Sequence, residues 1–264
     1  MPNENSRVHA LILTTSGEVR SKTLLRILAE ARITYEIVQN GDTESAVFEW
    51  NSKGGKDRPR KSLTKNERSC TFGHRKMYQR ALRNEHRYDY FLFLEDDAQL
   101  EIEALESLNS EGWSIKPDLL FLGSCGGWAR RKKIKLTNRI NCHRVFMNST
   151  LGSHAYLANK VGIKSLLVGT EKLDVLADEF SRKPKVDLYV IYPFVAFQQN
   201  FLQTTIPLPK QFTSTKFTRK FLSSIYDDLL DLKYLRRVGA RTLRLRELEK
   251  LFEPFLKKLP GCNI

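Results

Sequence analysis

The chain has 264 residues, of which 41% are hydrophobic, so it is long and apolar enough for one large α/β domain, alone or with a C-terminal appendage. Its formal net charge of +14 predicts an anionic partner: a nucleic acid, a nucleotide or an anionic membrane surface. No apolar run approaches the roughly 20 residues of a membrane span, and the first six residues have no signal-peptide core. The four cysteines form no C-x-x-C pair, which predicts reduced thiols in a cytoplasmic protein.

The first regular patterns predict a parallel sheet. Residues 8–14 form an apolar run typical of a strand, residues 18–32 have helical spacing, and residues 33–38 alternate like a second strand. The order strand–helix–strand is typical of parallel α/β sheets. The turn after the first strand offers Thr14 and Arg20 as contacts for a nucleotide phosphate, although an ordinary surface turn with a solvated arginine explains these residues equally well.

A basic loop and a helix follow. Residues 51–68 are loop-like, and between Lys53 and Arg87 there are 12 Lys or Arg against three acidic residues. This charge indicates either a loop that closes over a pyrophosphate or an anionic acceptor, or simply a solvated loop. Residues 63–82 have the spacing of a helix, within which His74 is, on spacing alone, a semi-buried histidine.

The central candidate site is an acidic triplet at the end of a strand. The apolar and aromatic run 90–94 predicts a fully buried strand. It delivers Glu95, Asp96 and Asp97 to the edge where open α/β sheets bind ligands. If the extended geometry continues through the triplet, Glu95 and Asp97 point to one side, where their oxygens suit Mg²⁺ or Mn²⁺. The alternative is that Asp96 or Asp97 caps a helix over residues 98–108.

Further elements are expected along the rest of the first 200 residues. These are a buried strand at 117–122 before a glycine cluster, a solvated charge run at 130–135, a segment from 151 leading into a helix that ends at 167, and a late strand at 187–192.

The composition changes near residue 210. Residues 210–264 hold 13 Lys or Arg against six acidic residues, and their apolar residues recur at helical spacing. We therefore divide the chain into a catalytic domain, residues 1–209, and a basic amphipathic helical tail, residues 210–264. Contact of this tail with an anionic membrane is the favoured interpretation; packing on the catalytic domain or on a second subunit is the alternative.

Several of these motifs together resemble a known family. Residues 63–74 read Leu-Thr-Lys-Asn-Glu-Arg-Ser-Cys-Thr-Phe-Gly-His, followed by a helix and a strand ending Leu-Glu-Asp-Asp at Asp97. This pattern is similar to the Leu-x-x-x-Glu-x-x-Cys-x-x-Ser-His and Leu-Glu-Asp-Asp motifs of glycosyltransferase family 25, the bacterial lipooligosaccharide galactosyltransferases. Weaker similarities are Gly152 to Tyr156, Leu173-Asp174, and Pro193 to Gln198.

Two positions depart from the family pattern. Ser69 stands where the family usually has glycine, and Gly73 stands where it usually has serine. The missing hydroxyl puts in doubt any direct role of position 73 in donor or acceptor binding.

The resemblance implies a GT-A-like fold, with a Rossmann-type nucleotide-binding sheet, and an inverting transfer. It implies that Glu95 and Asp97 hold Mn²⁺ (or Mg²⁺), with Asp96 as a further ligand or ribose contact. Asp174 is the candidate catalytic base, because it matches the family's Val-Asp position and has apolar neighbours; a buried aspartate that caps a helix is the alternative. The candidate donor-binding residues are Thr14, Arg20, His74, Asp96, Tyr156 and Gln198.

The function that follows is transfer of galactose from UDP-galactose to a lipooligosaccharide or lipid-linked acceptor, by an enzyme bound peripherally to the inner face of the bacterial inner membrane. Another UDP-sugar donor in the same fold is one alternative. A basic nucleic-acid-binding protein is the other, but the sequence has no nucleic-acid-binding motif, and an acidic triplet at a binding edge repels a polyanion. No nucleic-acid partner is therefore expected.

Overall fold

The computed structural model describes residues 7–15, 18–40, 43–52, 54, 63–123, 129–145, 152, 154–171, 176–177, 180 and 186–198. The chain divides into two compact units, Met1–Thr205 and Ile206–Ile264. The predicted tail, residues 210–264, lies outside the described residues, so its basic helices stay a prediction. Among the helices that are described, none has the length and apolar character needed to cross a membrane.

The described residues form five helices and ten strands. The helices are α1 (Lys22–Glu30), α2 (Thr43–Ser52), α3 (Lys65–Arg83), α4 (Ile102–Ser110) and α5 (Lys160–Gly169). The strands are β1 (Val8–Thr14), β2 (Thr34–Gln39), β3 (Tyr90–Glu95), β4 (Ala98–Leu100), β5 (Leu119–Phe121), β6 (Ala129–Lys135), β7 (Asn141–Val145), β8 (Ala155–Ala158), β9 (Leu188–Ile191) and β10 (Ala196–Gln198).

Eight of these strands form one mixed sheet in the order β2-β1-β3-β8-β5-β9-β7-β6. β1 pairs in parallel with both β2 and β3, which confirms the parallel sheet predicted from the opening strand–helix–strand pattern. β5 and β9 are also parallel, whereas β8 runs antiparallel to its neighbours β3 and β5. β4 and β10 form a separate two-stranded antiparallel sheet.

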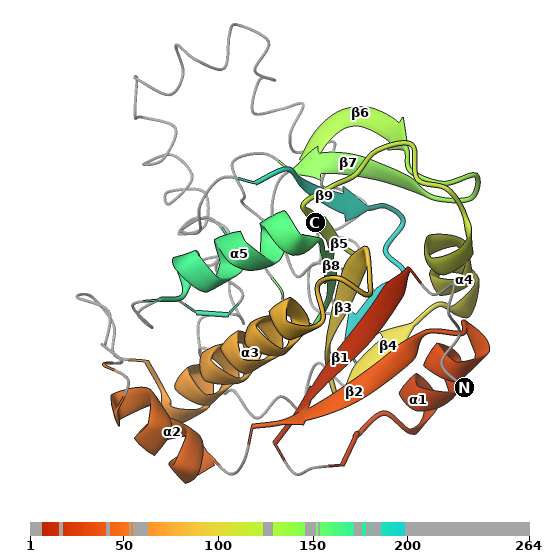
Figure 1. The fold of residues 1–264 in the computed structure, drawn as a ribbon. Coiled ribbons are helices and arrows are strands. Elements are labelled where there is room, and N and C mark those ends of the chain that lie inside the picture. Colours follow the sequence, from red (N-terminus) through yellow and green to blue (C-terminus); the bar gives the residue numbers. More distant parts are fainter. Residues whose placement is uncertain are drawn as a thin grey trace, which may run out of the picture. The chain divides into compact units, whose positions relative to one another are not determined.

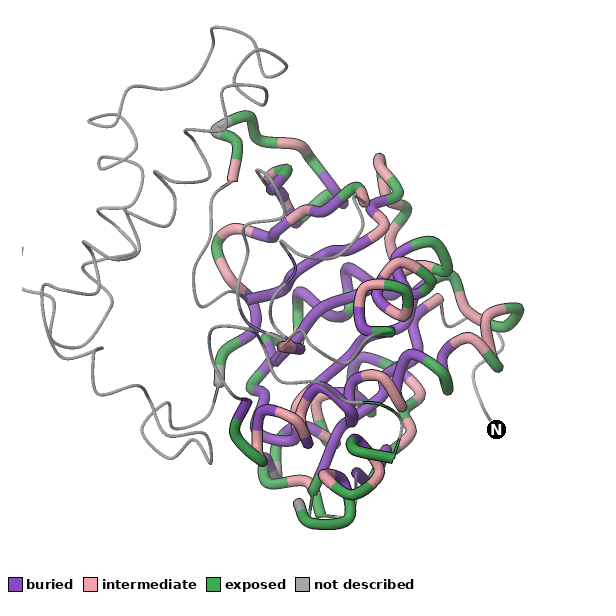
Figure 2. The backbone as a smooth tube through the Cα atoms, turned by 90° about the vertical axis from the view of Figure 1, so that its left-hand side faces the viewer, coloured by how far each residue is buried: buried purple, intermediate pink, exposed green. Residues whose placement is uncertain are grey.

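Helices cover both faces of the large sheet, with α1 and α4 on one face and α3 and α5 on the other (Figure 1). Each face has its own hydrophobic core. In β1, Ala10 and Ile12 belong to the core with α1 and α4, whereas Leu11 and Leu13 belong to the core with α3 and α5. A strand buried on both faces needs apolar residues at every position, which explains why the apolar runs of β1 and β3 do not alternate. Figure 2 shows this burial concentrated in the central strands.

The strands predicted from apolar runs are confirmed in β1, β3, β5 and β9, and the helix expected over residues 63–82 is α3. Two other expectations are wrong. The segment before residue 160 is the strand β8, and the region 98–108 holds β4 before α4 begins. The charge run 130–135 is solvated as predicted: Arg130, Lys132, Lys133 and Lys135 are exposed on β6, the strand at one edge of the sheet, where charged side chains discourage pairing with another chain.

A capping box fixes the start of α3. The Thr64 hydroxyl accepts from the backbone N–H of Glu67 at 3.2 Å, and the Glu67 carboxylate accepts from the backbone N–H of Thr64 at 2.8 Å. These bonds satisfy two donors that have no partner inside the helix. The helix then runs without interruption past His74, which faces the sheet and is fully buried.

Candidate functional site

The acidic triplet lies at the carboxyl end of β3, beside the carboxyl end of the parallel strand β1. Strand geometry ends at Glu95, and Asp96 and Asp97 form the turn into β4. The triplet is therefore not extended throughout, so the condition under which Glu95 and Asp97 would point to the same side of a strand is not met. The helix-cap alternative is wrong, because the N-cap residue of α4 is Glu101.

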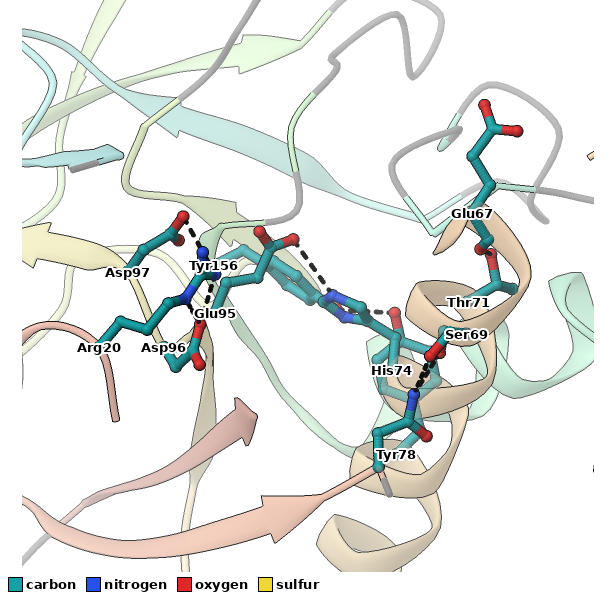
Figure 3. A network of polar contacts seen from close by, with 11 residues as sticks. Arg20, Glu67, Ser69, Thr71, His74, Tyr78, Glu95, Asp96, Asp97 and Tyr156 are labelled. Carbon is teal, nitrogen blue, oxygen red and sulfur yellow. Dashed lines mark hydrogen bonds and ion pairs between the residues drawn. The ribbon is translucent and has the colours of Figure 1, made fainter. Parts of the chain in front are cut away.

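Arg20 binds the two aspartates of the turn. Its Nε donates to Asp96 Oδ1 at 2.7 Å, and its Nη2 lies 2.5 Å from the same oxygen and 3.2 Å from Asp97 Oδ2. Figure 3 shows the guanidinium between the two aspartates, while Glu95 extends in the other direction. The backbone N–H of Ser21 also donates to the Asp96 carbonyl at 2.8 Å, which ties the start of α1 to the turn.

One carboxylate oxygen of Asp97 has no hydrogen-bond partner among the described residues, although Arg20 pairs with the other. Asp97 is only 7% exposed, and its Oδ1 makes no hydrogen bond to any described residue. Burial and the nearby charge of Glu95 raise the pKa of Asp97 to about 6, against the opposing effect of Arg20. A buried carboxylate oxygen without a partner, in a cluster with a net negative charge, is suited to a divalent cation.

A buried chain of polar side chains continues from Glu95. His74 Nε2 lies 3.6 Å from Glu95 Oε1, His74 Nδ1 lies 3.0 Å from the Tyr156 hydroxyl, and that hydroxyl lies 2.7 Å from the Tyr78 hydroxyl (Figure 3). Burial raises the pKa of Tyr156 and of Tyr78, so both hydroxyls stay protonated at neutral pH. Because His74 and Tyr156 are fully buried, this arrangement supports a role in positioning Glu95 rather than direct contact with a donor.

The two departures from the family pattern face one residue, Asn40. The Asn40 side-chain amide donates to the Ser69 hydroxyl at 2.7 Å and to the Ser69 carbonyl at 2.6 Å. A Cβ on Gly73 would lie 3.1 Å from Asn40 Cγ and 2.7 Å from Leu13 Cδ1. The hydroxyl missing at position 73 is thus present one helical turn earlier, and position 73 serves instead as the close contact between α3 and β1.

The remaining predicted donor-binding residues have separate positions. Thr14 ends β1 beside the triplet, but its hydroxyl donates to the Glu18 carbonyl at 2.8 Å within the turn. Gln198 pairs with Ala98 in the two-stranded sheet, which places its backbone next to the triplet, while its side chain lies outside the described atoms. The predicted base, Asp174, also lies outside the described residues.

The sequence reasoning missed His154. This residue immediately precedes β8, between the carboxyl ends of β3 and β5, and its carbonyl accepts from the backbone N–H of Glu95 at 3.0 Å. Its side chain is buried, and neither ring nitrogen hydrogen-bonds to a described residue. Burial lowers the pKa of His154 and keeps its ring neutral. His154 lies within the motif from Gly152 to Tyr156, in which the sequence analysis predicts only Tyr156 as a site residue.

The site is therefore a carboxylate cluster at the edge where α/β sheets bind ligands. Arg20 pairs with Asp96 and Asp97, and the buried His74 lies beside Glu95. Such a cluster has the chemistry to hold a divalent cation against an anionic ligand such as a diphosphate. A cation held by these carboxylates would supply charge stabilisation to an oxygen leaving group.

Comparison with solved structures finds weak similarity. One is a glycosyltransferase involved in the glycosylation of the major capsid of PBCV-1, with a TM-score of 0.33, 8% identity and coverage of 61% of this chain and 64% of that one. This chain thus spans slightly less than two thirds of that protein. Another is A197 from STIV, with a TM-score of 0.37, 16% identity and coverage of 76% and 98%.

Comparison with protein families identifies the family of this chain. No curated protein matches the chain. The family described as glycosyltransferase family 25 (LPS biosynthesis protein) matches residues 13–181, which include the α3 motif and the carboxylates at the end of β3. Because this match spans more than half of the 264 residues, the chain belongs to glycosyltransferase family 25.

Proposed function

We propose that this protein is an inverting, metal-dependent glycosyltransferase that transfers galactose from UDP-galactose to a lipooligosaccharide or lipopolysaccharide acceptor. Membership of the family supports the transferase class, and the description of that family as an LPS biosynthesis protein supports an acceptor of this kind. The choice of galactose is supported by the resemblance of residues 63–97 to lipooligosaccharide galactosyltransferases. Another UDP-sugar, bound in the same GT-A-like fold, is the alternative.

The observation that carries the proposal is the buried oxygen Asp97 Oδ1, which has no hydrogen-bond partner among the described residues. With Glu95 and Asp96 it forms a carboxylate cluster where α/β sheets bind ligands. Mn²⁺ or Mg²⁺ at Glu95 and Asp97, with Asp96 as a further contact, would stabilise the ionised form of Asp97, which burial and the charge of Glu95 disfavour by raising its pKa. When bound, the cation would neutralise charge that develops on the departing nucleoside diphosphate.

Other residues of the protein orient the carboxylates and transfer the proton. Arg20 holds Asp96 and Asp97 in a defined orientation, and His74, backed by Tyr156, positions Glu95. We assign the proton transfer to Asp174, which accepts the proton of the acceptor hydroxyl as the acceptor oxygen bonds to the sugar C1. The bond from C1 to the diphosphate oxygen breaks on the opposite side, so the configuration inverts.

The basic tail supports a location at an anionic membrane. Its excess of Lys and Arg at helical spacing is suited to the interface of such a membrane, where lipid-linked acceptors reside. Removal of residues 216–264 is expected to reduce sedimentation of the protein with anionic vesicles. Unchanged sedimentation of the truncated protein would contradict the membrane role.

The decisive experiment measures thermal stability with UDP, with and without Mn²⁺. A ligand that binds only the folded protein raises stability by roughly 2.7 kcal/mol at a hundredfold excess over Kd. We expect a stabilisation that needs both UDP and Mn²⁺ and that is lost in Asp97→Asn. Turnover of a panel of UDP-sugars then identifies the donor.

The matched control is Asp89→Asn. Asp89 immediately precedes β3 at its amino end, where it pairs with Arg7 on the surface. This variant is expected to keep the full response to UDP and Mn²⁺. A response to UDP that needs no metal, or that persists in Asp97→Asn, would contradict the assignment of the cation to the triplet.

A further inference from the structure

A second cluster of ligand atoms lies where α3 meets the end of β3. Cys70 Sγ, a ring nitrogen of His74 and a carboxylate oxygen of Glu95 all lie within 4.8 Å of one another. Cys70 and His74 are four residues apart on α3, which puts their side chains on the same side of the helix. We propose that these three residues bind Zn²⁺.

The state of His74 is the independent observation that points to a metal. The ring is fully buried, and its Nε2 makes no hydrogen bond to a described residue although it faces Glu95. On the other side, Nδ1 lies 3.0 Å from the Tyr156 hydroxyl. When Tyr156 donates its own proton to Tyr78, its oxygen accepts from Nδ1–H, and this tautomer leaves a lone pair on Nε2.

In this tautomer the Nε2 lone pair faces the Glu95 carboxylate, an arrangement that is favourable only when a cation lies between the two. Metal-bound histidines commonly donate their other ring N–H to an oxygen acceptor, which fixes the tautomer and the orientation of the ring. In the proposed site, the Tyr156 hydroxyl is the acceptor for His74 Nδ1–H, at the 3.0 Å distance seen between the two atoms.

The ligand set favours zinc over the hard cation proposed for the triplet. Thiolate and imidazole ligands select Zn²⁺, whereas Mg²⁺ and Mn²⁺ prefer oxygen. Two atoms bound to one tetrahedral Zn²⁺ at its usual bond lengths are roughly 3.3–3.6 Å apart. The 3.6 Å between His74 Nε2 and Glu95 Oε1 already matches this spacing, and Cys70 Sγ lies within 4.8 Å of the other two ligand atoms. A fourth position is left for water, as in open zinc sites.

The zinc proposal does not depend on the transferase reaction. Glu95 is common to both metal sites, so the test relies on Cys70, which the proposed donor-cation site does not contain. The control is Cys142, a buried cysteine on β7 in the core of the opposite face of the sheet.

The experiment titrates the full, EDTA-treated protein with Co²⁺, a spectroscopic substitute for Zn²⁺. We expect one equivalent to bind with a sulfur-to-cobalt charge-transfer band, and Zn²⁺ to abolish that band by displacement. Cys70→Ser is expected to lose the band and to bind at least about tenfold more weakly, whereas Cys142→Ala keeps both. Tyr156→Phe, which removes only the outer hydroxyl, is expected to weaken binding by about 10–100-fold.

The proposal is overturned if the natural protein shows no charge-transfer band, or if the band persists in Cys70→Ser. Far-ultraviolet circular dichroism in EDTA establishes that Cys70→Ser is folded. The UDP and Mn²⁺ stabilisation gives a separate readout. Its absence alongside a Cys70-dependent cobalt band would contradict the transferase site and leave the zinc site standing.

Discussion

Gly73 of α3 lies directly against Leu13 of β1, so closely that a Cβ on the glycine would be 2.7 Å from Leu13 Cδ1 and 2.8 Å from Leu13 Cδ2. Real Cβ atoms essentially never approach other atoms so closely. The missing side chain lets the helix approach the sheet. The next residue, His74, thereby comes within 3.6 Å of Glu95 at the end of β3.

Gly73→Ala is expected to destabilise the protein. Overpacking at a buried contact costs about 1–3 kcal/mol, and the higher helix propensity of alanine returns up to about 1 kcal/mol, so a net loss of about 1–2 kcal/mol is expected in urea unfolding. Gly112→Ala is the control, because its Cβ meets no atom within 4 Å, and a change below about 1 kcal/mol is expected. Equal stability of the two variants would contradict the tight contact.

The two buried tyrosines are expected to differ in their contribution to stability. The Tyr156 hydroxyl lies between two partners, His74 and Tyr78, so Tyr156→Phe deprives both of a hydrogen bond and should cost about 1–3 kcal/mol. Tyr78→Phe removes only the last hydroxyl of this hydrogen-bonded series and should cost about 0.5–1.5 kcal/mol. Denaturant unfolding of both variants measures the difference. A larger loss for Tyr78→Phe would contradict the position of Tyr156 between His74 and Tyr78.

Arg20→Gln should weaken the protein mainly when no cation is present. Loss of a charged hydrogen bond to the buried carboxylate of Asp96 is expected to cost about 1–3 kcal/mol in EDTA, and Mn²⁺ should reduce this loss. The control is Arg26→Gln, which removes an exposed pair with Glu30 and should change stability by less than about 0.5 kcal/mol. Thermal unfolding in EDTA and in Mn²⁺ tests both. A loss that Mn²⁺ does not reduce would indicate that Arg20 acts independently of the cation site.

The pH dependence of stability should carry the signature of Asp97. Its pKa in the folded protein is about 6, above the ordinary value of 3.8, so the folded state holds the proton more tightly than the unfolded state does. Stability from this group is therefore greatest at low pH and falls as the pH rises from about 4 to 6. In EDTA at pH 7.5, Asp97→Asn should be more stable than the natural protein by up to about 3 kcal/mol.

The measurement is denaturant unfolding in EDTA at a series of pH values. Asp89→Asn, at the exposed amino end of β3, should follow the natural protein throughout. Parallel curves of stability against pH for the natural protein and Asp97→Asn would contradict the raised pKa of Asp97. Addition of Mn²⁺ and UDP should reverse the order of stability, because only the natural protein retains the proposed cation ligand.

The sequence by itself determined the features that depend on local pattern. Apolar runs identified β1 and β3 as strands buried on both faces, helical spacing identified α3, and the position of Glu95 after an apolar strand placed a carboxylate at the ligand-binding edge. These predictions succeeded because strand and helix periods are properties of a few consecutive residues. The motif around His74 similarly indicated the family from nearby residues alone.

Only the tertiary structure decided which side chains meet. Arg20 pairs with Asp96 across 76 positions of the chain. β8 enters the sheet antiparallel between β3 and β5, although its sequence predicts a segment that leads into a helix. The same holds for the contact of His74 with Glu95, which depends on how closely α3 packs on β1. Such contacts depend on strand register and on packing between distant segments, and a local periodicity in the sequence carries no information about either.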